Sequence, residues 1–118
     1  MKKTVGSICD AYKALSKLIL QDIPLRLGIK LYHLRESIRA TYAFACAEEQ
    51  KAQEAFHAEL MNNGRLHFES VEEKEKYLVK IQDILDTEVD LEIIPVDVSG
   101  LDGGTLVNLG ALDGFVTF

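Results

Sequence analysis

Apolar residues recur at helical spacing near the start of the chain. Successive apolar positions are three or four residues apart, at Val5, Ile8, Tyr12, Leu15 and Ile19. Side chains at this spacing share one face of an α-helix, and lysines occupy positions between them. The pattern therefore predicts an amphipathic helix over residues 5–19.

The pattern breaks at Asp22 and Pro24 and then restarts. Aspartate caps helix N-termini through its carboxylate, and proline is tolerated in a first turn, so the pair predicts a second helix start. No proline lies between Pro24 and the Asn-Asn-Gly of residues 62–64. This tripeptide can end a helix with a residue in the left-handed conformation. A helix of roughly 35–40 residues, about 55 Å long, is thus allowed. Because a compact domain of this size has a radius of gyration of about 13 Å, we expect this helix to kink or to reach a partner.

The long helix has two apolar faces. One forms a stripe that would pack on the first helix in an antiparallel hairpin, at Leu27, Leu31, Leu34, Ile38, Ala45, Ala52, Phe56 and Leu60. The other is rich in small residues, at Leu25, Ile29, Ala40, Ala43 and Ala47. Small residues allow close helix approach, so we expect this second face to be covered by another copy of the chain or by the folded-back C-terminal segment.

Strand and helix signals alternate after the long helix. Residues 65–68 alternate polar and apolar as a short strand does. Ser70 and Glu73 then form a capping box, in which the hydroxyl serves the Glu73 amide and the carboxylate reaches back. The helix that this box begins is expected to run to about Thr87, with one apolar side at Val71, Tyr77, Leu78, Ile81, Ile84 and Leu85.

The pattern after residue 87 predicts a strand, a loop and a tail. Residues 88–95 alternate cleanly, and their antiparallel partner is expected in residues 65–68 or 115–118. A loop rich in turn residues follows at 97–104, and residues 106–112 predict a short helical turn.

Together these elements predict a single α+β domain over residues 1–118. Residues 1–64 form a helical hairpin with one long helix, and residues 65–118 add the third helix, the strands and the C-terminal tail. We expect one small antiparallel β-sheet, built from residues 65–68, 88–95 and the tail, in an oligomeric protein. A chain of 118 residues buries a limited core, so a homo-oligomer would add to its burial.

The charge is unevenly distributed. Residues 1–39 carry eight basic and three acidic residues, a balance of +5, whereas residues 40–118 carry five and sixteen, a balance of −11, giving −6 overall. An acidic chain repels bulk nucleic acid, so the asymmetry favours complementary contacts between subunits or a local basic surface for an anionic ligand. No signal peptide or membrane-spanning run is evident, and Cys9 and Cys46 read as isolated core thiols, so a cytoplasmic location is expected.

Candidate catalytic patterns are incomplete. Glu54 and His57 form a Glu-x-x-His pair on a helix, which is half of a di-iron ligand set whose second half is missing. The loop from Asp97 lacks the acidic twelfth position of a calcium loop, and no serine has a triad pattern. We therefore expect neither an enzyme nor a bound cofactor or metal.

A basic stripe is the remaining candidate for a ligand-binding site. It consists of Arg26, Lys30, Arg35, Arg39 and Tyr42. Guanidinium groups chelate phosphate and a tyrosine ring stacks on a base, so these residues suit a nucleotide. A solvated or salt-bridged helix face is the alternative, because Arg26 and Lys30 point in one direction and Arg35 and Arg39 in another.

Three stretches taken together resemble a known family. They are AYKALSKLILQDIPLRLGIKL, NGRLHFESVEEKEKYLVKIQDILDTEVDLEI and LGALDGFVTF. They are similar to small uncharacterised proteins of tailed bacteriophages, with their Leu-Pro turn, Leu-Asp-x-Glu-Val run and acidic-apolar strand. The resemblance covers most of the chain except residues 40–58, and it implies a phage origin and an infected bacterial host cell.

These observations suggest a non-enzymatic phage-encoded binding protein. We expect it to act in counter-defence, either by sequestering an anionic nucleotide signal at a subunit interface lined by the basic stripe or by blocking a host defence protein. The alternative is a structural protein of the virion or an accessory of tail or head assembly.

Overall fold

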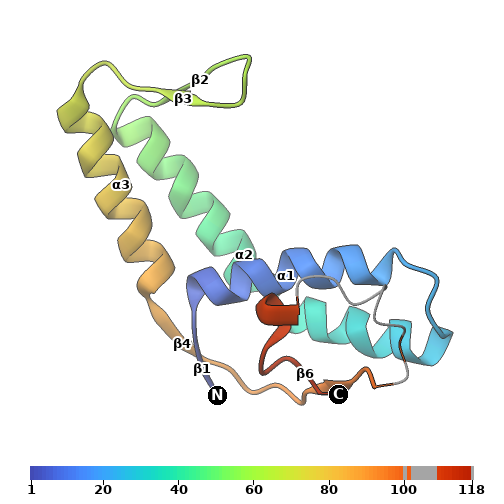
Figure 1. Cartoon of the computed structure of the whole chain (residues 1–118). Coiled ribbons are helices and arrows are strands. Elements are labelled where there is room, and N and C mark those ends of the chain that lie inside the picture. Colours follow the sequence, from blue (N-terminus) through green and yellow to red (C-terminus); the bar gives the residue numbers. More distant parts are fainter. Residues whose placement is uncertain (100, 102–108, 118) are drawn as a thin grey trace.

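A computed structural model, which describes residues 1–99, 101 and 109–117, shows an elongated α+β protein (Figure 1). The described chain contains three α-helices, α1 (Val5–Ile19), α2 (Leu25–Ala55) and α3 (Val71–Asp86). The first half of α2 runs back alongside α1, and its second half changes direction and rises beside α3. The extents are 51 × 32 × 19 Å and the radius of gyration is 16.8 Å, larger than the ~13 Å of a compact domain. We call residues 40–86 the arm and the remaining described residues the body.

The helix predicted over residues 5–19 is confirmed as α1. Thr4 is its N-cap, and the Thr4 hydroxyl oxygen accepts a 3.1 Å hydrogen bond from the Ser7 amide. Ile8 and Leu15 are fully buried on its inner face. The N-cap and the buried apolar face of α1 both agree with the range that the apolar spacing predicted.

Both predicted ends of the long helix were wrong. Pro24, and not Asp22, is the N-cap of α2, and its side chain makes no capping bond. The helix ends at Ala55, because His57 takes a left-handed φ of 55° and the chain turns into a hairpin. Residues 62–64 form the turn of that hairpin, between β2 (Glu59–Leu60) and β3 (Leu66–His67).

The predicted single sheet was also wrong. The described strands form separate pairs: β1 (Lys2–Thr4) lies antiparallel to β4 (Glu88–Asp90), and β5 (Val96–Asp97) lies parallel to β6 (Val116–Thr117). The predicted strand at 65–68 shortens to β3 and pairs with its sequence neighbour β2 at the far end of the arm. The length of α3 separates that hairpin from the other strands, so one sheet could not form.

The core lies in the body. Leu31, Leu34 and Ile38 of α2 pack there with the inner face of α1 and with the C-terminal segment, whose short 3₁₀ helix η1 spans Leu109–Leu112. The predicted turn over 106–112 is thus found in its described part, while residues 100, 102–108 and 118 lie outside the described residues. The buried cluster comprises Ile8, Ala11, Ala14, Leu15, Leu18, Leu31, Leu34, Ile38, Val96, Val98, Leu112, Phe115 and Val116.

The arm buries much less. Of the described arm residues, the buried apolar ones are Ala45, Ala52 and Tyr77, and the Tyr77 ring packs 5.1 Å from that of Phe68. Val71 and Leu78, predicted on the apolar side of α3, are exposed because α3 packs against α2 along one side. None of the described helices combines the length and the apolar character needed to cross a lipid bilayer.

Candidate functional site

The small-residue face of α2 is open in the single chain. Leu25 is 79% exposed and Ile29 49%, and the alanines at 40, 43 and 47 are all exposed. Tyr32, 45% exposed, lies on the same face by helical periodicity. The described C-terminal segment packs into the core beside α1, so it does not fold back over this face as one of the two predictions supposed.

Arg26 and Lys30 form the open part of the basic stripe. Both side chains are exposed on the first turns of α2. Lys30 lines a shallow pocket with Asp97, whose carboxylate accepts a 2.9 Å hydrogen bond from the Ser99 amide. That bond lowers the pKa of Asp97, and the Ser99 hydroxyl and the charge of Lys30 lower it further. Lys30 therefore stands beside an ionised carboxylate.

The rest of the basic stripe is engaged inside the chain. Arg35 lies over the rings of Tyr12 and Tyr32, at 5.9 and 5.2 Å from their centroids. Its guanidinium and that of Arg39 each approach Glu36 at 3.5 Å. Tyr42 stacks on Tyr12 with 4.1 Å between ring centroids. The five predicted residues thus lie on two sides of α2 and do not converge on one site.

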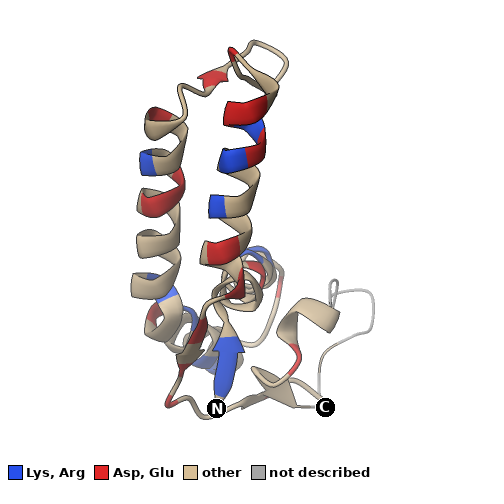
Figure 2. Ribbon diagram, turned by 90° about the vertical axis from the view of Figure 1, so that its left-hand side faces the viewer, with Lys and Arg blue, Asp and Glu red and all other residues tan. Residues whose placement is uncertain are grey.

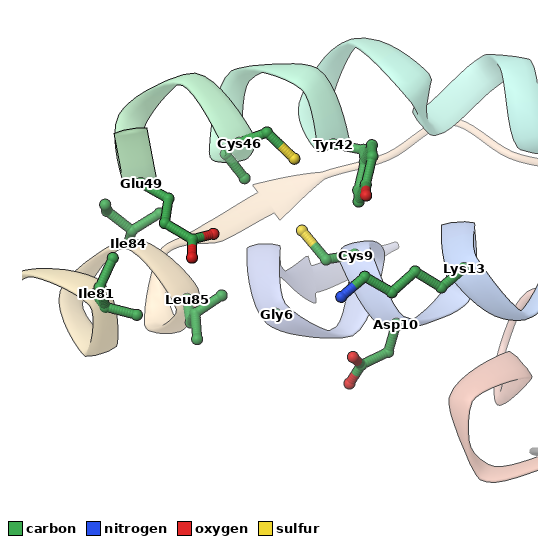
Figure 3. Close-up of a pocket in the computed structure, with 11 residues that line it drawn as sticks. Gly6, Cys9, Asp10, Lys13, Tyr42, Cys46, Glu49, Ile81, Ile84 and Leu85 are labelled. Carbon is green, nitrogen blue, oxygen red and sulfur yellow. The ribbon is translucent and has the colours of Figure 1, made fainter. Parts of the chain in front are cut away.

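Sequence reasoning missed a pocket where the body meets the arm. It has a volume of about 340 Å³ and lies between α1, α2 and α3 (Figure 3). Cys9 from α1 and Cys46 from α2 both line it, with Lys13 and Glu49 near them and Ile81, Ile84 and Leu85 of α3 on the apolar wall. The two thiols, expected to be isolated core residues, are therefore neighbours, with Cys9 half-buried and Cys46 exposed.

The packing of the pocket shifts the pKa values of two of its side chains. Burial raises the pKa of the Cys9 thiol, and the neighbouring Cys46 raises it further. Hydrogen bonding to Cys46, followed by burial, raises the pKa of Tyr42. One sequence signal could have pointed here, because each cysteine is one helical turn from a tyrosine of the stacked pair.

The outer surface of the arm is apolar and acidic. Val71, Leu78 and Val79 of α3 are exposed, as are Leu60 and Met61 of the hairpin. The arm carries ten acidic and five basic residues, a balance of −5, and Figure 2 shows acidic residues on both of its helices. Exposed apolar side chains gathered on an element that projects from the core are typical of a protein-binding surface.

Glu54 and His57 do not form a metal site with other ligands. His57 Nδ1 lies 3.0 Å from a Glu73 carboxylate oxygen, and Glu54 is exposed. No group of three or more metal-ligating side chains occurs in the described part of the chain. The Glu73 carboxylate therefore pairs with His57 and does not reach back to Ser70, which corrects half of the predicted capping box; the Ser70 hydroxyl does accept from the Glu73 amide, at 3.1 Å.

Comparisons with family models, curated protein sequences and solved structures found no match to this chain.

Proposed function

We propose that the protein is a non-enzymatic binding protein that works as a homodimer and blocks another protein. The observation that carries the proposal is the open small-residue face of α2 together with a second, separate apolar surface on the arm. In such a protein the face of α2 would join the copies and the surface of the arm would contact the target.

A second copy fits the small-residue face of α2. The first half of the helix has Arg26, Lys30, Arg35 and Arg39 against Glu36, whereas the half from residue 40 has three glutamates against Lys51. An antiparallel pair of α2 helices would therefore place each basic half against an acidic half.

The surface of the arm suits a protein target with basic and apolar side chains. The exposed valines and leucine of α3 would supply the apolar contacts, and the surrounding acids would favour a basic rim. Placement in an infected bacterial cell, with a host defence protein as the target, rests on the resemblance to tailed-phage proteins. A role in virion structure or assembly would use the same two surfaces.

Nucleotide sequestration has weaker support than protein binding. Arg35 and Arg39 share Glu36, and Tyr42 stacks on Tyr12, so an anion at these three residues would compete with contacts inside the chain. Calorimetric titration with cyclic and ADP-ribose-type nucleotides should therefore give no heat. Binding that Arg26→Ala weakens would favour the nucleotide function instead.

Light scattering tests the dimer. We expect twice the chain mass of 13.2 kDa, and we expect Ala43→Arg to yield a monomer by placing a charge at the centre of the α2 pair. Ala55→Arg is the matched control, because Ala55 is exposed on α2 but lies about 120° round the helix from Ala43. A monomeric wild type, or equal effects of the two variants, would contradict the dimer.

Affinity purification from infected cells tests the target surface. We expect one protein to be retained by the wild type and by Gln82→Glu but lost with Leu78→Glu, since both positions are exposed on α3 and only leucine supplies apolar contact. A partner that Leu78→Glu retains would contradict the role of the arm. Stoichiometric recovery of the chain in purified virions by mass spectrometry would establish the virion role in place of target blocking.

A further inference from the structure

The pocket at the foot of the arm brings together both cysteines of the chain. Cys9 and Cys46 are far apart in sequence, come from different helices, and are free thiols in the structure. In Figure 3 their sulfur atoms point toward each other across the pocket. Since the proposed blocking function uses neither thiol, the pair calls for an explanation of its own.

The register of the two helices makes Cys9 and Cys46 a facing pair. The rings of Tyr12 and Tyr42 stack 4.1 Å apart with an interplanar angle of 14°. In Figure 3 the segment of α2 with Tyr42 and Cys46 runs opposite to the start of α1, so one turn back from Tyr12 and one turn forward from Tyr42 lead to the next facing positions, which are Cys9 and Cys46.

Packed helices bring facing residues into disulfide range. Helix axes pack about 8–10 Å apart and Cα atoms lie about 2.3 Å from each axis, so facing Cα atoms approach to roughly 4–6 Å. A disulfide needs Cα atoms about 4.4–6.8 Å apart. A pair of helices packed at this usual spacing can therefore hold a disulfide between facing positions.

The pocket also gives a small oxidant access to the thiols. Cys46 is exposed and lines the cavity of about 340 Å³, whereas Cys9 is half-buried. Burial raises the pKa of Cys9 and so keeps it as the less reactive neutral thiol. The exposed Cys46 is therefore the thiol that an oxidant reaches first, and Cys9 is placed to react second.

We propose that Cys9 and Cys46 are a modification site at which a peroxide forms an intramolecular disulfide between α1 and α2. In the first step the Cys46 sulfur attacks one peroxide oxygen, the O–O bond breaks, and a sulfenic acid and one water form. In the second step Cys9 attacks the Cys46 sulfur, the S–O bond breaks, and the hydroxyl leaves with the thiol proton as a second water. The two thiols lose two electrons and the peroxide gains them.

The bond would tie the body to the arm. Cys9 lies in the first turns of α1, and Cys46 lies in the part of α2 that belongs to the arm. The pocket wall formed by α3 is the place where the arm rests on α1. The disulfide would close a loop of several tens of residues in the unfolded chain, which stabilises the folded protein and should raise its thermal midpoint by about 10 °C.

The test is oxidation of the reduced full-length protein by hydrogen peroxide, followed by intact mass spectrometry and peptide mapping. We expect a loss of about 2 Da, a Cys9–Cys46 cross-linked peptide, and reversal by dithiothreitol. Cys9→Ser should instead accumulate oxidised Cys46, with no loss of two hydrogens. Sulfinic acid on the wild type without a cross-link, or a cross-link between two copies, would overturn the proposal.

A second measurement tests whether the folded helices, and not random encounters of the chain, bring the two thiols together. The disulfide should form faster in the folded protein than in concentrated urea, because the helix pair holds the thiols together. Equal or slower formation in the folded protein would show that the α1–α2 interface does not place them, and would also overturn the proposal.

Discussion

The body and the arm are built from the same helix α2 yet are stabilised in different ways. In the body, α2 contributes Leu31, Leu34 and Ile38 to a buried cluster drawn from α1 and the C-terminal segment as well. In the arm, the same helix contributes the buried alanines Ala45 and Ala52, and α3 adds the buried ring of Tyr77. The same helix therefore buries large apolar side chains in the body, where several elements pack together, and only small ones in the arm, where α3 is its partner.

Stability should differ accordingly between the two regions. Regions with few buried apolar contacts open locally at lower free energy than the core. The arm relies on an N-cap, on the ring contact between Phe68 and Tyr77, and on surface ion pairs such as Lys76 with Glu72. Surface pairs of this kind contribute little. We therefore expect the arm to open before the body unfolds.

The largest effect is expected from Phe115→Ala in the body. Phe115 is 1% exposed, and its loss leaves a large cavity in the core. The free energy of unfolding should fall by about 3–5 kcal/mol, as measured by urea denaturation. The same truncation at an exposed arm residue, Leu78→Ala, should change it by less than about 0.5 kcal/mol. Comparable losses for the two variants would remove the contrast between body and arm.

Tyr77→Ala should act on the arm alone. Removal of this ring takes away its contact with Phe68 and should lower the free energy of arm opening by about 2–3 kcal/mol. Hydrogen exchange should speed up in α3 and in the second half of α2, while the amides of α1 keep their protection. Tyr77→Phe is the control, since it keeps the ring. Equal loss of protection in α1 would show that arm and body unfold as one unit.

The sequence predicted elements well where local signals agreed with packing. The apolar spacing predicted α1, whose N-cap Thr4 the structure added, and Ser70 predicted the start of α3. It failed where distant contacts decide the outcome. The partner of β4 is the N-terminal strand β1, because α3 returns the chain beside the first residues, and no local pattern contains that information.

The sequence predicted only part of the candidate site, because the rest depends on contacts between helices. Helical periodicity placed Arg26 apart from Arg35, as the structure has it, and placed the alanines on a separate face. It could not show that Arg35 lies over Tyr12, because that contact depends on the register of α1 against α2. The pairing of Cys9 with Cys46 depends on that register too, so the sequence left them as isolated thiols.

A smaller effect is expected when the N-cap residue of each region is replaced by alanine. Thr4 caps α1 in the body and Ser70 caps α3 in the arm, each through a 3.1 Å hydrogen bond to its side-chain oxygen. Alanine at either position should cost about 1 kcal/mol. For Thr4→Ala the loss should appear in global unfolding, whereas for Ser70→Ala it should appear as faster hydrogen exchange confined to the arm. Identical exchange patterns for the two variants would contradict the division into two regions.

The smallest effect is a pH dependence at the tip of the arm. The hydrogen bond to Glu73, and then the charge of that carboxylate, raise the pKa of His57 above its ordinary value of 6.5. A group whose pKa is higher in the folded state stabilises fully below its unfolded pKa, and this contribution is lost as pH rises through the folded pKa. Arm protection, corrected for the intrinsic pH dependence of exchange, should therefore fall as pH rises above 6.5. NMR titration of the His57 ring provides the direct measurement, with Glu73→Gln as the variant that removes the carboxylate and should return the His57 pKa toward 6.5. A wild-type His57 that titrates at or below this value would mean that the pair with Glu73 does not form, and the arm would then lose one of its few polar links between the end of α2 and α3.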